Sequence, residues 1–175
     1  MSDLLVLATL LRGPTHGYAL KKQIGMITGQ GDLHNNLVYP LLKRFVAEGW
    51  VTRRTVDGER GQTRELYALS AKGRRELVER LSVFSEKDAA HGEACLMRVG
   101  LFAILDREVR LKIIETRDAW LAARQQRLQA LSSGMDLGEW GGESVALLLR
   151  QIALERKWLS ALRKKASRSA KRKSD

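Results

Sequence analysis

The sequence predicts a mostly α-helical protein with one short pair of β-strands in its first half and two long antiparallel helices at its C-terminal end. Aromatic residues make up only 6% of the 175 residues and there are two prolines, a composition that disfavours a large β fold. Residues 50–69 combine β-prone segments with a polar, glycine-containing connection. Elsewhere, apolar residues recur mainly with the three- and four-residue spacing of helices.

A short helix is expected to begin at Ser2, whose hydroxyl can cap it, and to stop at the Gly13–Pro14 break. Its leucines are spread too widely for a surface stripe, so it should be buried among other helices. A second helix follows a cap at Thr15 or His16 and ends at the GQGD run of residues 29–32.

The third helix is expected to start at the GQGD run and to end at Gly49, with one apolar and one polar face. The inner face holds Val38, Leu41, Leu42, Phe45 and Val46. The outer face is left with Asn35, Asn36, Tyr39, Lys43 and Arg44. Such a helix packs on one side and offers polar and cationic side chains to a partner on the other.

Two β-biased segments, Trp50–Val56 and Arg64–Leu69, flank the polar connection DGERGQT. This connection is too long for the tightest hairpins and suits a protruding wing. Ser70 then caps a fourth helix that carries Leu77, Val78, Leu81 and Phe84. Three helices followed by a two-stranded β wing make a winged helix-turn-helix, a module that reads DNA.

The second half has no strand signal. An apolar helix from about Glu93 to Leu105 precedes Asp106, a good N-cap for a helix that reaches Ser132. After the linker SSGMDLGEWGG, a last helix from Glu143 carries one apolar stripe. Such an antiparallel hairpin cannot bury both apolar faces alone. We therefore expect a C-terminal helical dimerisation domain that packs on the N-terminal half or on a second copy.

The net charge of +11 is concentrated at the two ends of the chain. Residues 1–85 carry 13 Lys and Arg against 8 Asp and Glu, residues 86–162 carry 11 of each, and residues 163–175 carry 7 against 1. Basic ends favour a nucleic-acid partner, although a basic tail also serves solubility alone. We expect a DNA-binding domain at 1–85, a helical dimerisation and effector domain at 86–166, and a disordered basic tail at 167–175.

Several classes of protein are disfavoured. No early segment resembles a leader peptide, and the apolar stretch near residues 94–105 is too short to span a bilayer, so we expect a cytoplasmic protein without a membrane partner. The single Cys95 excludes an internal disulfide and is expected to pack in the core rather than to sense redox state. Three scattered histidines and no glycine-rich phosphate loop predict no enzyme, cofactor or metal site.

Three blocks, HGYAL (16–20), NLVYPLLKRFVAEGWV (36–51) and ERGQTRELYALSAKG (59–73), resemble the PadR-type transcriptional regulators. RVGLFAILDREV (98–109) and the Trp158-Leu159 pair resemble the longer subfamily with a virulence-activator-like C-terminal domain. The resemblance implies a homodimeric, usually repressing regulator on a two-fold site in double-stranded DNA. It also implies release of the DNA by a small, frequently aromatic effector.

Asn35 and Asn36 can each donate and accept hydrogen bonds, as adenine edges require, but asparagine also caps helices, and both roles stay open. The resemblance implies that Tyr39 lies at the DNA surface and that the Tyr18 hydroxyl contacts a phosphate. For Tyr39 the alternative is packing against the second helix. The chain departs from the family pattern at Asn36 and at Gln62-Thr63 in the wing, so no operator sequence is carried over.

Basic side chains on the second and third helices and on the wing are expected to neutralise phosphates, unless they are only solvated. They are Lys21, Lys22, Lys43, Arg44, Arg53, Arg54, Arg60 and Arg64. Arg60, at the tip of the wing, is the candidate for entering a minor groove, with a backbone contact as the alternative.

Trp120 and Trp158 fall on opposite long helices, and Arg117 and Arg124 lie beside Trp120. A cation next to an indole is suited to an aromatic anionic effector, through stacking and a charge-assisted hydrogen bond. In the alternative, both tryptophans belong to the dimer core. The arginines would then pair across the interface with Asp118 or Glu155.

A second candidate function is a winged-helix protein-interaction adaptor with non-specific nucleic-acid binding. An adaptor needs neither a cationic outer face on the third helix nor a basic wing, and this chain has both. The sequence therefore favours the DNA-binding regulator.

Overall fold

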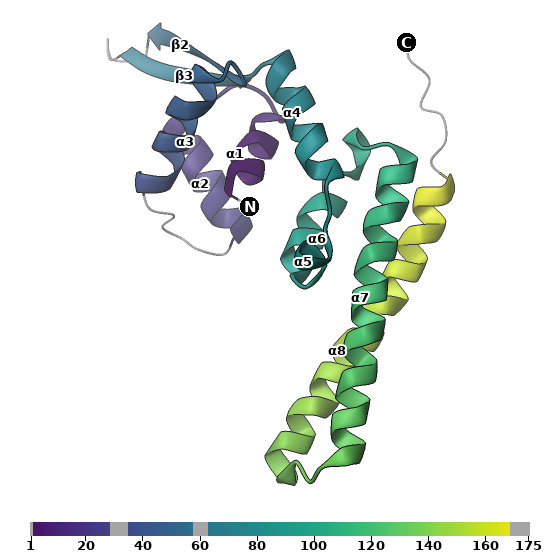
Figure 1. Ribbon diagram of the computed structural model, residues 1–175. Coiled ribbons are helices and arrows are strands. Elements are labelled where there is room, and N and C mark those ends of the chain that lie inside the picture. Colours follow the sequence, from purple (N-terminus) through teal and green to yellow (C-terminus); the bar gives the residue numbers. More distant parts are fainter. Residues whose placement is uncertain (1, 29–34, 58–62, 169–175) are drawn as a thin grey trace. The chain divides into compact units, whose positions relative to one another are not determined.

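The computed structural model describes residues 2–28, 35–57 and 63–168. The chain divides into two compact units, residues 1–83 and 84–175 (Figure 1). Within the described ranges, no helix combines the length and the apolar character that crossing a bilayer requires. Each unit has its own secondary structure and its own buried core.

The first unit is a winged helix-turn-helix, as the sequence predicts (Figure 1). It contains four helices and one small sheet. The helices are α1 (Ser2–Leu10), α2 (Gly17–Thr28), α3 (Asn35–Ala47) and α4 (Ala71–Ser82). The strands are β1 (Thr15–His16), β2 (Val51–Asp57) and β3 (Thr63–Leu69).

The sheet has three antiparallel strands in the order β1-β3-β2, one more than the sequence predicts. β2 and β3 form the wing hairpin, with Val51 opposite Leu69. The extra strand β1 pairs Thr15 with Tyr67, far along the chain. A two-residue strand has no periodicity of its own, so its only signal is this long-range pairing.

The core of the first unit confirms the inner face predicted for α3. Val38, Leu42 and Phe45 are fully buried, and the Phe45 ring lies 5.3 Å from the Trp50 ring. Burial of each such side chain stabilises the fold by about 1.5–3 kcal/mol. Leucines from the other three helices complete the core: Leu7, Leu10, Leu20, Leu77 and Leu81.

The predicted stop of α3 and start of α4 meet at one place. After α3, Gly49 has φ +72°, a left-handed conformation that favours glycine. The Ser70 hydroxyl oxygen accepts a hydrogen bond from the Gly73 amide at 2.9 Å, which caps α4. The same hydroxyl donates to the Gly49 carbonyl at 2.7 Å, so one serine fixes both helix ends.

The second unit contains α5 (Glu86–Ala89), α6 (Gly92–Val99), a 3-10 turn η1 (Phe102–Ile104), α7 (Arg107–Gly134) and α8 (Gly138–Arg168). The long α7 and α8 pack as an antiparallel hairpin (Figure 1). Described residues of this unit form no strand, in agreement with the sequence. The predicted start of the C-terminal tail at residue 167 falls within α8, and residues 169–175 lie outside the described part of the chain.

Two predicted helix boundaries in the second unit are wrong. The helix expected from Glu93 to Leu105 ends at Val99, because Gly100 favours a helix end and a 3-10 turn follows. The last helix begins at Gly138 rather than Glu143. There the Gly138 amide, at φ +62°, donates to the Asp136 side chain at 2.9 Å, so a single tight turn replaces most of the expected linker.

Apolar residues from α7 and α8 form the core of the hairpin. Ile113, Ile114 and Leu121 of α7 are buried, as are Ile152 and Leu159 of α8. Cys95 on α6 is also buried, and burial raises the pKa of its thiol to about 11. The thiol is therefore protonated near neutral pH, which fits the predicted core role rather than a reactive one.

Candidate nucleic-acid interface

The first unit carries the described residues that the sequence predicts for DNA contact. They are Tyr18, Lys21 and Lys22 on α2, Tyr39, Lys43 and Arg44 on α3, Arg53 and Arg54 on β2, and Arg64 on β3. Asn35 and Asn36 form the first turn of α3, but their side chains lie outside the described part of the structure. Arg60 also lies outside it.

A surface depression of about 570 Å³ brings several of these residues together. Tyr18 is 73% exposed and Tyr39 is 43% exposed, so both phenol groups can meet a partner. Four elements contribute to the lining: β1, α2, α3 and β3. The lining residues are His16, Gly17, Tyr18, Ala19, Tyr39, Arg64, Glu65 and Tyr67.

Gly17 makes room for the Tyr39 ring. A Cβ atom at residue 17 would lie 2.8 Å from Tyr39 Cε1, which is closer than real side chains approach. Beside it, the His16 Nδ1 donates to the Glu65 carbonyl oxygen at 3.0 Å and ties β1 to β3. Gly17 is not among the residues predicted from the sequence, although its place between His16 and Tyr18 is a local signal.

Tyr39 and Arg44 lie on opposite flanks of α3. Five residues of α-helix turn the side chain by about 140°, so the two cannot share one line along the helix. Tyr39 faces Gly17, whereas Arg44 forms an ion pair with Asp3 of α1. Lys43 is exposed between these two flanks. The outward face of α3 therefore has an aromatic side chain, Tyr39, along one edge. Along the other edge it has a cation, Arg44, that is paired with Asp3.

The wing arginines differ in their surroundings. Side chains alternate between the two faces of a strand, so Arg53 and Arg54 point to opposite sides of the sheet. Arg53 Nε lies 3.3 Å from Glu65 Oε2, and the Thr55 hydroxyl donates to Glu65 Oε1 at 3.1 Å. Arg54 and Arg64 are exposed on the surface.

Tyr67 contributes a largely buried side chain to the depression. It lies opposite Arg53 in the sheet and is only 9% exposed. Burial raises the pKa of its phenol, and the Glu65 carboxylate raises it further. A phenol held in its protonated form is a hydrogen-bond donor at neutral pH. The sequence analysis missed Tyr67, because only the pairing of β3 with β1 and β2 brings it to this place.

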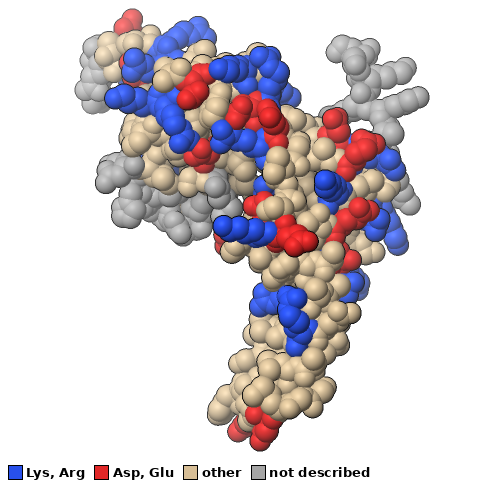
Figure 2. Space-filling model, viewed as in Figure 1, with Lys and Arg blue, Asp and Glu red and all other residues tan. Residues whose placement is uncertain are grey.

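Several groups of Lys and Arg side chains lie on the visible face of the first unit, with acidic side chains between them (Figure 2). A surface of this kind attracts polyanions over a distance of about 10 Å at moderate salt. The described residues contain no cluster of three or more His, Cys, Asp or Glu side chains arranged to hold a metal ion. The Lys and Arg side chains suit this surface to binding the phosphates of a partner.

The residues predicted for effector binding lie in the second unit, where Arg117 is fully engaged. Its Nε and Nη2 donate to the two carboxylate oxygens of Glu155, each at 2.7 Å, and its Nη1 donates to the Ala89 carbonyl. The guanidinium groups of Arg117 and Arg124 lie 5.1 and 5.2 Å from the Trp120 ring centre. The pairing of Arg117 with Glu155 occurs within one chain, and Trp158 is partly exposed.

Comparison with known proteins gives a family for the first unit. Residues 6–79 match the transcriptional regulator PadR-like family. A comparison with curated proteins finds no match. Among solved structures, protein TA0346 from Thermoplasma acidophilum is 31% identical over 45% of this chain and 74% of its own, with a TM-score of 0.42.

PadR from Bacillus subtilis in complex with operator DNA is 20% identical over 94% of this chain and 98% of its own, with a TM-score of 0.41. The same protein in complex with p-coumaric acid is 19% identical over 94% of this chain and 98% of its own, with a TM-score of 0.39.

Proposed function

Because the chain belongs, through residues 6–79, to the PadR-like family of transcriptional regulators, we propose that it binds a specific DNA site and regulates transcription from it. The depression of the first unit carries this proposal. Tyr18 and Tyr39 are exposed there beside Arg64, and hydroxyl and guanidinium donors are the groups that fix a protein on phosphates. α3 adjoins the depression, so its first turn is the candidate for reading base edges.

The second unit is proposed to form a homodimer through α8. Trp140, Leu147 and Leu154 are exposed at seven-residue intervals, an apolar stripe distinct from the buried one that packs on α7. On the face shown in Figure 2, a stretch of the α7–α8 hairpin near its far end is uncharged, with acidic side chains at the tip itself. A second copy of the hairpin has the same stripe and would cover it symmetrically. We propose that the chain represses transcription, and this part of the proposal rests on the family alone.

The first prediction concerns the salt dependence of DNA binding. The chain should prefer DNA from its own upstream region over unrelated DNA of equal length, and salt should weaken the binding. Lys43→Gln should lower affinity for all sequences alike and make the slope of log K against log salt shallower by about 0.9. Fluorescence anisotropy of labelled duplexes at about 50–200 mM salt measures the affinity for each duplex and the salt slope.

Arg127→Gln is the matched control, since it removes the same charge from an exposed site on α7. Its slope should equal that of the unmodified chain. Sedimentation of the complex between the unmodified chain and its preferred duplex should give two chains per duplex. Equal affinity for every DNA would instead identify a non-specific adaptor, and absence of salt-dependent binding would overturn the proposal.

The second prediction uses the contact between Gly17 and Tyr39. Gly17→Ala should push the Tyr39 ring aside and lower affinity for the preferred DNA by about tenfold, the equivalent of about 1.4 kcal/mol. Because the displaced group is a half-exposed side chain, the fold should remain intact. Anisotropy with the preferred duplex measures the affinity, and circular dichroism measures the helix content.

A double variant separates displacement of the ring from damage to α2. In a Tyr39→Ala background no ring remains to be displaced, so Gly17→Ala should have no additional effect. If the two substitutions were additive, Gly17 would act on DNA binding by another route.

A further inference from the structure

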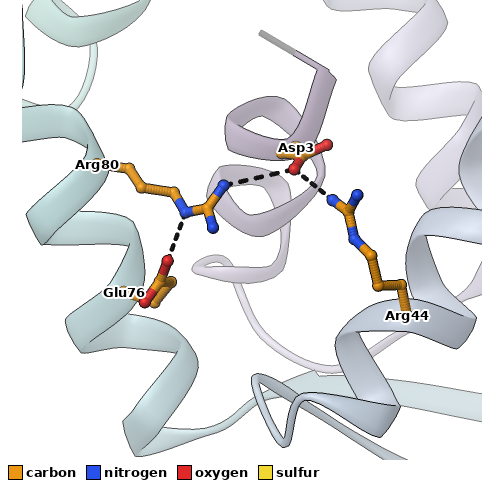
Figure 3. Close-up of polar contacts among 4 residues, drawn as sticks. All are labelled: Asp3, Arg44, Glu76 and Arg80. Carbon is orange, nitrogen blue, oxygen red and sulfur yellow. Dashed lines mark hydrogen bonds and ion pairs between the residues drawn. The ribbon is translucent and has the colours of Figure 1, made fainter.

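Three helices of the first unit meet at the carboxylate of Asp3 (Figure 3). Asp3 lies in the first turn of α1, and its Oδ2 accepts a hydrogen bond from Arg44 Nη2 of α3. The same oxygen lies 3.5 Å from Arg80 Nη1 of α4. Arg80 Nε in turn donates to Glu76 Oε1 at 2.5 Å. One negative charge is therefore shared by two guanidinium groups.

The two arginines are not held equally. Arg80 has a second carboxylate, Glu76, and its guanidinium lies 4.7 Å from the centre of the buried Trp50 ring. Arg44 has Asp3 as its acidic partner, with the Phe45 ring 5.1 Å from its guanidinium. The Arg44 side chain is 49% exposed, compared with 38% for Arg80. Arg44 is thus the more accessible partner of the shared carboxylate.

Asp3 accepts a hydrogen bond from Arg44 Nη2, a donor that a DNA phosphate could also use. A carboxylate and a phosphate both present anionic oxygens to the guanidinium fork, so they compete for the same donors. Arg44 follows Lys43 on α3, the helix proposed to meet DNA. A guanidinium that is already neutralised by an internal carboxylate releases no counterion when DNA binds.

We propose that Asp3 is an internal competitor of DNA phosphate, which keeps Arg44 out of the DNA contact and so weakens binding to all sequences. This inference rests on the proposed DNA-binding function. It assigns to α1 a role in setting affinity, separate from base reading by the start of α3. Arg44, placed by the sequence among the phosphate contacts, becomes one only when Asp3 is neutralised.

A four-protein comparison in the full chain tests the proposal: unmodified, Asp3→Asn, Arg44→Gln and the double variant. Asp3→Asn should raise affinity for preferred and unrelated DNA alike and steepen the salt slope by about 0.9, the value for one more phosphate contact. Arg44→Gln alone should leave the slope unchanged. The double variant should return the slope to that of Arg44→Gln.

Two results would overturn the inference: a shallower slope for Arg44→Gln alone, or an unchanged slope for Asp3→Asn. Asp3→Glu, which keeps the charge, should retain the original slope. If circular dichroism shows that Asp3→Asn does not fold, the salt slopes of Arg44→Gln and Asp3→Glu still test the inference. A change in either slope would contradict it. The unmodified chain tests the proposed function by itself. If it shows no salt-dependent DNA binding, the proposed function is wrong, whereas the Asp3 and Arg44 variants test only the role of Asp3.

Discussion

Replacement of Gly73 by alanine is expected to destabilise the first unit by about 3 kcal/mol. A Cβ atom at this residue would overlap the Trp50 carbonyl oxygen and lie 2.8 Å from the Trp50 carbonyl carbon. These are backbone atoms, which cannot rotate away. The same carbonyl oxygen accepts a hydrogen bond from Ser70 N at 2.9 Å, so any shift would also disturb the start of α4.

Gly142→Ala is the matched control for this prediction. Gly142 also lies within a helix, α8, but a Cβ atom there would have no neighbour within 4 Å. Alanine should therefore stabilise α8 by about 0.5–1 kcal/mol. Hydrogen exchange measured by mass spectrometry reports the opening free energy of each unit separately, which a two-unit chain requires. If the amides of the first unit exchanged as slowly in the Gly73→Ala variant as in the unmodified chain, the close approach of α4 to Trp50 would be contradicted.

Local signals explain why most of the first unit could be predicted from the sequence. The inner face of α3 follows from the spacing of Val38, Leu42 and Phe45, and the start of α4 follows from the Ser70 cap. β1 could not be predicted, because it is defined by pairing with residues about 50 positions away. The helix α5 was also missed, although the Ser85–Asp88 capping box that begins it is a local signal.

The candidate site was predictable in composition but not in its contacts. The spacing of α3 shows which side chains face outward, and it places Tyr39 and Arg44 in one polar set. Their partners come from other elements: Gly17 from α2 and Asp3 from α1. Periodicity within one helix contains no information about which neighbouring residue meets each flank. For this reason the sequence analysis treated Arg44 as equivalent to Lys43, whereas the ion pair sets them apart.

Arg117→Ala is expected to destabilise the second unit by about 3 kcal/mol. Arg117 is only 5% exposed, and its guanidinium joins three elements: Glu155 on α8, the Ala89 carbonyl on α5, and its own helix α7. Removing it leaves the Glu155 carboxylate and a buried carbonyl without their donors, which costs more than the loss of an exposed ion pair. Denaturant unfolding followed by hydrogen exchange in α7 and α8 measures the change.

Arg156→Ala provides a control of the same chemistry, because Arg156 Nε also donates to a carboxylate across the hairpin, Asp118 Oδ1 at 2.8 Å. This pair is more than one-third exposed on both sides, so its loss should cost only about 0–1 kcal/mol. A double variant, Arg117→Met with Glu155→Leu, should recover most of the stability, since it removes both charges of the pair together. Equal losses for Arg117→Ala and Arg156→Ala would show that burial does not decide the strength of these pairs. Failure of the double variant to recover would instead assign the stabilisation to the Ala89 contact, and hence to the attachment of α5 to the hairpin.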